Sequence, residues 1–186
     1  MTRCLSDQLA SRISRRIAPA SVLALSVVSL SAVGHSGESR WEPLHEPSVG
    51  GRVTSIAASP HDPGRVLVGG DMLGVGISTN GGDAWGATFG FKSWEIGDFT
   101  WHPDDPDTVW VGTMGGPYVS HDGGVNWTAK RSGLPPVASL DFSAPIEKVL
   151  FDPNDSHTLL AFGGSSRRWR AKQVTGDFGA VWKSTD

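Results

Sequence analysis

Cysteine, charge and the usual catalytic motifs are all scarce in this 186-residue sequence. The one cysteine, Cys4, lies in the N-terminal leader described below, so disulfides and cysteine-ligated metal sites are excluded from the rest of the chain. Charged residues make up 19% and the net charge is −3, which does not favour binding to nucleic acid or to an anionic membrane. The sequence also lacks the Gly-x-Ser-x-Gly elbow, the phosphate-binding loop and the His-Glu-x-x-His zinc helix. We therefore expect no cofactor and no bound metal, and the sequence leaves the oligomeric state open.

Glycine, proline and tryptophan are abundant instead, with 24, 12 and 8 residues. This composition is typical of many short strands joined by tight turns, with tryptophan side chains filling the core. It does not suit a helical bundle. We therefore predict an all-β fold.

The first 34 residues have the pattern of an export signal. Arg12, Arg15 and Arg16 give a basic start, and an apolar stretch of small residues follows at 17–33. Ala32-Val33-Gly34 offers the small residues at which a signal peptidase cleaves. The stretch is interrupted by Pro19 and by serines, unlike a membrane anchor. We predict a secreted or periplasmic protein with no membrane contact beyond this signal; the alternatives are a poorly ordered N-terminus and a wrongly assigned start codon.

The rest of the chain contains a repeated unit. Ser78 and Ser120 begin the same turn motif 42 residues apart, a spacing typical of a four-stranded propeller blade. Each unit has an apolar strand, a turn rich in Pro, Asp and Asn, a second strand, a glycine-rich connection and a third strand. The expected strands are 53–59, 66–69 and 75–79, then 96–102, 108–112 and 118–121, then 146–152, 158–162 and 180–185.

These repeats predict a partial β-propeller over residues 53–186, after a lead-in segment at 35–52. It has two four-stranded antiparallel blades and most of a third. The blades cover residues 53–95, 96–145 and 146–186. The third motif stops at Asp186, and closed propellers have roughly four to eight blades. We therefore expect an N-terminal fragment or a truncated gene product; the alternative is that partial propellers assemble into a ring.

The repeated turn reads Ser-x-Asp/Asn-x-Gly-x-x-Trp. Asn80 and Asp122 can accept backbone N–H bonds across the turn, the glycines supply positive φ, and Trp85 and Trp127 return to the core. The motif resembles the Asp-box, or BNR, repeat of sialidase-like propellers. That resemblance implies a structural hairpin away from any active site, so we expect no catalytic role for Asp122. Sialidase activity is not expected, because the Arg-Ile-Pro motif of that family is missing after the leader.

Loop length varies on the face opposite these turns. In repeat folds, insertions on one side usually mark the binding face. Aromatic rings beside charged groups suit sugars, because rings stack on pyranose faces and polar groups bond the hydroxyls. The predicted substrate-binding residues are Trp94, Glu95, Asp98, Tyr118, Trp169 and Arg170. Packing of Trp94 and Trp169 between blades, and a solvated loop around Arg170, are the alternatives.

The segment 68–76, Val-Gly-Gly-Asp-Met-Leu-Gly-Val-Gly, resembles the first blade of glycoside hydrolase family 74, the xyloglucanases. The family reads roughly Thr-Asp-Ile-Gly-Gly-Ala-Tyr, whereas Gly70 precedes Asp71 here and Leu73 stands in place of a glycine. The resemblance implies that Asp71 is one of two catalytic carboxylates, as glycosidic cleavage requires. The second family carboxylate comes from a later propeller that this sequence does not include. A structural role for Asp71 in its turn is the alternative.

Together these observations predict an exported propeller of glycoside hydrolase type. It hydrolyses or binds an extracellular polysaccharide or oligosaccharide, of β-glucan or xyloglucan type. The alternatives are a non-catalytic propeller that binds protein or glycan and an inactive truncated fragment, since one fold supports many functions.

Overall fold

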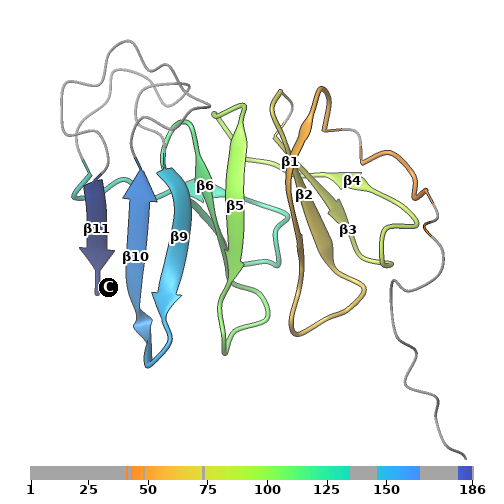
Figure 1. Cartoon of the computed structure of the whole chain (residues 1–186). Coiled ribbons are helices and arrows are strands. Elements are labelled where there is room, and N and C mark those ends of the chain that lie inside the picture. Colours follow the sequence, from red (N-terminus) through yellow and green to blue (C-terminus); the bar gives the residue numbers. More distant parts are fainter. Residues whose placement is uncertain are drawn as a thin grey trace, which may run out of the picture. The chain divides into compact units, whose positions relative to one another are not determined.

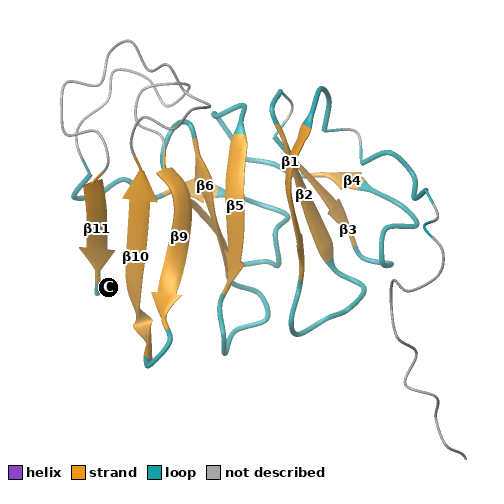
Figure 2. Cartoon of the chain, in the orientation of Figure 1, coloured by secondary structure: helices purple, strands orange, loops and turns teal. Residues whose placement is uncertain are grey.

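A computed structural model of the chain describes residues 41, 43–47, 49–72, 74–134, 146–163 and 180–185. The chain divides into two compact units, Met1–Trp41 and Glu42–Asp186, and all the strands below belong to the second unit. Within the described residues there are eleven strands in three antiparallel sheets and no helix (Figure 2). No helix in this part of the chain is therefore long and apolar enough to cross a membrane.

The three sheets follow one another along the chain as blades 1, 2 and 3. Blade 1 has the order β1 (Val53–Ala58), β2 (Val66–Gly70), β3 (Val75–Ser78) and β4 (Gly86–Ala87). Blade 2 has the order β5 (Ile96–Trp101), β6 (Val109–Thr113), β7 (Tyr118–Ser120) and β8 (Thr128–Ala129). Blade 3 has β9 (Ile146–Asp152), β10 (Asp155–Gly163) and β11 (Ala180–Ser184), with β10 in the middle (Figure 1).

The first strands of neighbouring blades contact each other, β1 with β5 and β5 with β9. Blades that meet through their first strands form a β-propeller, so the predicted all-β partial propeller is confirmed. The predicted strands agree with the observed ones to within one residue at each end, except in β10. That strand begins at Asp155, inside the predicted turn, and its pairing with β9 shifts register between Asp155 and Leu159.

Loops of two kinds emerge at opposite ends of each blade. The turn after the first strand lies beside the turn after the third, because Gly81 N donates to Gly64 O at 2.8 Å in blade 1 and Gly123 N donates to Asp107 O at 2.8 Å in blade 2. At the other end, Asp71 N donates to Arg52 O at 3.1 Å, which joins the β2–β3 loop to the segment before β1. We call this second end the loop face.

Alternating side chains of each middle strand face different neighbours. Val109 and Val111 belong to the core between blades 1 and 2, whereas Trp110 packs against the core between blades 2 and 3. The larger core contains Leu67 from blade 1 and Trp127 from blade 2. The smaller core contains buried Ile146, Val149 and Leu159.

Glycines allow the inner strands of neighbouring blades to approach closely. A Cβ built on Gly112 of β6 would overlap the carbonyl oxygen of Ile146 in β9, and one on Gly97 of β5 would overlap that of Glu147. A Cβ on Gly69 of β2 would lie 2.6 Å from Ile96 Cγ2 in blade 2. A Cβ atom at these positions would overlap the neighbouring strand, so only glycine fits there.

The segment before β1 covers the free side of blade 1. Val49 is only 4% exposed and lies against the positions of Gly70 and Gly76, as a Cβ on either glycine would meet it. The other side of the molecule is different: the side of blade 3 that faces away from blade 2 carries the exposed apolar residues Leu160, Phe162 and Val181.

Candidate functional site

Asp71 follows β2 directly and lies on the loop face. Its Oδ1 accepts the backbone N–H of Arg52 at 2.8 Å, and its Oδ2 lies 3.9 Å from Arg52 Nε. The side chain is 28% exposed, so one side of the carboxylate remains open to solvent. Gly51, with φ of 60°, passes so close that a Cβ there would overlap Asp71 Oδ1. Backbone geometry and an ion pair therefore fix the position of this carboxylate.

A second carboxylate shares the same guanidinium group. Arg52 Nη2 lies 3.6 Å from Glu95 Oε1, and the Glu95 side chain is 12% exposed. Glu95 directly precedes β5, and its carbonyl oxygen accepts the backbone N–H of Met114, in the loop between β6 and β7, at 3.3 Å. Glu95 therefore lies on the loop face, as Asp71 does. Arg52 thus links the β2–β3 loop of blade 1 to the segment that enters blade 2. Two of the sequence-predicted residues, Asp71 and Glu95, are brought together by an arginine that the sequence analysis did not select.

Two exposed apolar residues are sequence neighbours of the two carboxylates. Trp94 is 53% exposed and precedes Glu95, and Met72 is 57% exposed and follows Asp71. A half-exposed indole ring can stack on a sugar ring, and charged groups on the same face can bond its hydroxyls.

Tyr118 does not belong to this surface. It is 1% exposed, and its ring centroid lies 5.0 Å from that of Phe91 within the core that also holds Trp127. Its hydroxyl accepts the backbone N–H of Lys92 at 3.2 Å. The prediction that Tyr118 contacts a substrate is therefore contradicted by its burial between blades 1 and 2.

Asp98 lies on β5, away from the cluster around Arg52. Lys148 Nζ of β9 donates to Asp98 Oδ2 at 3.3 Å, so this pair links blade 2 to blade 3. The pair is largely exposed, and such surface ion pairs contribute roughly 0–1 kcal/mol. Trp169 and Arg170, the other predicted binding residues, lie outside the described residues.

The repeated turns form a hydrogen-bonded network at the opposite end. Ser120 Oγ donates to Asp122 Oδ1 at 2.7 Å and accepts Gly124 N–H at 2.9 Å. The same Asp122 oxygen accepts the backbone N–H of Asn126 at 2.8 Å. Partial burial raises the pKa of Asp122, but the hydrogen bonds from Asn126, Ser120 and Val125 outweigh it, so the pKa lies below its ordinary value. The hydrogen bonds that the Asp122 carboxylate accepts therefore come from residues of the same turn.

No group of three or more His, Cys, Asp or Glu residues in the described part of the chain could hold a metal ion.

No protein-family model and no curated protein match this chain. Solved structures do. A crystal structure of an ancestral GH74 (glycoside hydrolase family 74) enzyme matches with a TM-score of 0.60 and 24% identity, over 80% of this chain and 18% of that chain. The GH74 xyloglucanase from Xanthomonas campestris matches with a TM-score of 0.50 and 20% identity, over 73% of this chain and 21% of that one.

These comparisons show that the chain has the fold found in GH74 enzymes. At this level of identity they concern the fold alone. The chain spans about a fifth of the length of the two solved structures.

Proposed function

We propose that this chain belongs to an exported propeller of glycoside hydrolase type, which binds or hydrolyses an extracellular polysaccharide of the β-glucan or xyloglucan class. Asp71 is the proposed catalytic carboxylate, Trp94 contacts the sugar, and Glu95 holds Arg52 in place through their ion pair. The observation that carries the proposal is the position of the Asp71 carboxylate. It is partly open to solvent on the loop face and held by Arg52, and Gly51 leaves room for it.

The chemistry of glycoside cleavage supports this choice. One carboxyl group protonates the leaving oxygen, and another acts as base or nucleophile. A carboxylate fixed by a backbone N–H and an ion pair has a single orientation, which such a reaction needs. Glu95 is largely buried against Arg52, so its carboxylate does not act as the catalytic partner of Asp71 in this proposal.

A non-catalytic glycan-binding propeller is the second candidate. It is favoured by one observation: both Asp71 oxygens already contact Arg52, which is also how a purely structural aspartate is used. In that case Asp71 supports the loop, and Trp94 with the charged groups binds the sugar.

Calorimetric titration of xyloglucan oligosaccharides into the full chain tests the proposal. We expect Asp71→Ala to weaken binding about 10-fold or more, the loss typical of a hydrogen bond to a charged group. Asp104→Asn is the matched control, since Asp104 is an exposed aspartate in the turn between β5 and β6, at the end away from the loop face. Unchanged affinity in Asp71→Ala, or no binding by the wild-type chain, would refute the proposal.

Release of reducing sugar separates the two candidates. If the wild-type chain or its longer natural form hydrolyses the glycan, Asp71→Asn should reduce the rate by about 100-fold or more, as expected for a general acid or base. Binding without sugar release, in both wild type and variant, identifies the non-catalytic propeller.

A further inference from the structure

Arg52 carries an exposed guanidinium group on the loop face. Its side chain is 64% exposed, its Nε lies 3.9 Å from Asp71 Oδ2, and its Nη2 lies 3.6 Å from Glu95 Oε1. Both separations are too long for hydrogen bonds, so these contacts are ion pairs only. Within the described residues, no side-chain nitrogen of Arg52 donates a hydrogen bond to another residue. The N–H donors of the guanidinium are therefore available to a ligand.

Asp71 offers an acceptor beside these donors. Its Oδ1 accepts the backbone N–H of Arg52 at 2.8 Å, whereas its Oδ2 accepts no hydrogen bond in the part of the chain that the structure describes. A single hydroxyl oxygen can accept from Arg52 Nε and donate to Asp71 Oδ2, because the 3.9 Å between these two atoms is shorter than two hydrogen bonds end to end. The pair therefore matches a hydroxyl group, which both donates and accepts.

Backbone contacts hold the donors and the acceptor together. Arg52 N donates to Asp71 Oδ1 at 2.8 Å and Asp71 N donates to Arg52 O at 3.1 Å, so the two residues are joined in both directions. Glu95, whose side chain is 12% exposed, restrains the far side of the guanidinium. A pair that is fixed before binding loses little conformational entropy when a ligand binds.

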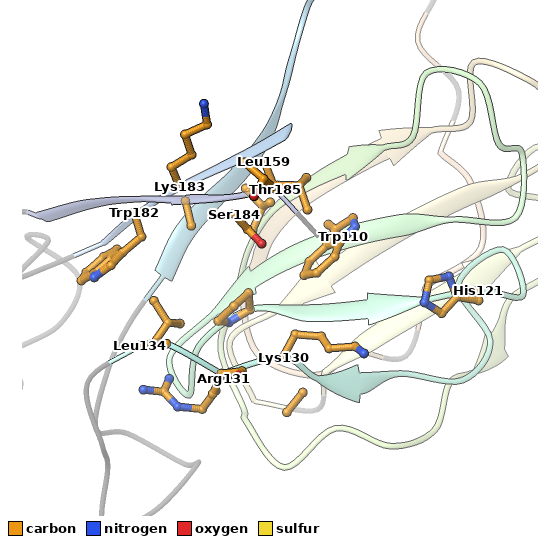
Figure 3. Close-up of a pocket in the computed structure, with 16 residues that line it drawn as sticks. Trp110, His121, Lys130, Arg131, Leu134, Leu159, Trp182, Lys183, Ser184 and Thr185 are labelled. Carbon is orange, nitrogen blue, oxygen red and sulfur yellow. The ribbon is translucent and has the colours of Figure 1, made fainter. Parts of the chain in front are cut away.

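The other two arginines that the structure describes are used within the protein. Arg65, at the end opposite the loop face, donates from Nη1 to Asp107 Oδ1 at 3.3 Å, and its side chain is only 24% exposed. Arg131, at the wall of the pocket shown in Figure 3, donates from Nη1 to Gly115 O at 2.8 Å. Of these three arginines, Arg52 is therefore the one placed to bind a ligand.

The charge of this cluster favours a neutral ligand. Asp71 and Glu95 carry two negative charges and Arg52 one positive charge, so the formal net charge is −1. A sugar carboxylate here would be attracted by one charge and repelled by two. A neutral diol meets no such repulsion, and its hydroxyl groups can use the donors of Arg52 together with the acceptor of Asp71.

We propose that Arg52 determines sugar specificity at this site: its guanidinium and Asp71 Oδ2 together bind adjacent hydroxyl groups of a neutral glycan, and glycans that carry carboxylates bind more weakly. Glu95 acts as a positioning residue that orients the guanidinium and does not touch the sugar. The inference rests on the proposed function, because it names the residue that selects the sugar at the same site.

Calorimetric titration of xyloglucan oligosaccharides into the full chain tests the contact. Arg52→Met keeps the apolar stem and removes every donor, so we expect affinity to fall about 10-fold or more. Arg52→Lys should recover only part of the loss, since an ammonium group keeps the charge without the planar fork. Arg65→Met is the matched control: it removes the ion pairs at the opposite end and should leave affinity unchanged. Equal affinity of wild type and Arg52→Met would overturn the inference.

A second comparison separates direct contact from a purely supporting role. If Arg52 bonds the sugar, Arg52→Met should still lower affinity about 5-fold or more in an Asp71→Asn background. If Arg52 acts only by holding Asp71, the second substitution has no further effect, and the proposed contact is wrong. A loss of affinity in Asp71→Ala but not in Arg52→Met leaves the proposed function standing without this inference, whereas no binding by the wild-type chain removes both.

Charge on the sugar supplies the last comparison. The same oligosaccharides, with their primary alcohols oxidised to carboxylates, should bind about 5-fold more weakly than the neutral forms, as for one net like charge at close range in water. Added salt should reduce this difference by screening. Equal or tighter binding of the oxidised oligosaccharides would contradict the specificity for neutral glycans.

Discussion

The contribution of Asp122 to stability can be tested sharply, because the equivalent turn of blade 1 has asparagine, Asn80, at the same position. Replacing Asp122 by alanine removes an acceptor for four donors: Ser120 Oγ at 2.7 Å, Val125 N at 3.1 Å, and Asn126 N and Nδ2 at 2.8 and 2.7 Å. Water replaces part of this bonding, since the turn lies on the surface. The closest measured case is an N-cap aspartate, so we expect a loss of about 1–2 kcal/mol in the free energy of unfolding.

Asparagine at the same position should cost less. In blade 1, Asn80 Oδ1 accepts Ser78 Oγ and Ala84 N at 2.9 Å each, so an amide oxygen supports this turn. The amide nitrogen cannot accept from Asn126 Nδ2, and that bond is lost. We expect Asp122→Asn to fall between wild type and Asp122→Ala, about 0.5–1 kcal/mol below wild type.

The pH dependence has a definite sign. The folded state holds the pKa of Asp122 below its ordinary value of 3.8. This stabilisation is complete above the unfolded pKa and disappears as pH falls through the folded one. The difference between wild type and Asp122→Asn should therefore be constant near neutral pH and shrink below about pH 4.

Urea unfolding followed by tryptophan fluorescence measures these differences. For a unit of this size, each kcal/mol also lowers the melting temperature by roughly 2–4 °C. The reasoning fails if Asp122→Ala is as stable as wild type, or if Asp122→Asn is the less stable of the two variants. A gap that widens on acidification would contradict the sign of the pKa shift.

Two further predictions concern packing and export. Gly112→Ala should destabilise the protein by about 3 kcal/mol or more, because its methyl group would overlap the backbone of β9. Gly86→Ala is the control: its nearest neighbours are 3.8 Å away, so the same urea titration should find it close to neutral. If both variants unfold at the same urea concentration, contact between inner strands does not fix these glycines. Export predicts that mass spectrometry of the secreted chain finds a new N-terminus at His35, after Gly34; an intact leader on protein recovered outside the cytoplasm would contradict it.

Much of the fold could be predicted from the sequence, because the repeated turn motif allows the three blades to be aligned with one another. The serines at 78, 120 and 184 mark the ends of equivalent strands, and turn residues fix the boundaries locally. The start of β10 was missed because residues after Pro153 have turn composition, while pairing with β9 extends the strand back to Asp155.

The candidate site was harder to predict, because it depends on contacts between loops. Tyr118 follows a glycine-rich stretch and has the sequence of an exposed loop residue, but it begins β7 and its side chain turns toward blade 1. The alternation of side chains along a strand does not show which neighbouring blade a given side chain contacts. Arg52 gave no signal in the sequence, since its role arises only when the β2–β3 loop and the segment before β5 come together.

The contrast between small inner and large outer residues gives each blade a wedge shape. Between blades 1 and 2, Gly69 lets the inner strands approach closely, whereas Trp127, Tyr118 and Phe91 hold the outer parts apart. The angle of that wedge determines how many blades complete a full turn. Substitutions that thicken the inner edge would open the curvature and favour more blades, and smaller outer residues would act in the same direction. Ring size is thus encoded in a few side-chain volumes at each junction, without any change in the hydrogen bonding of the sheets.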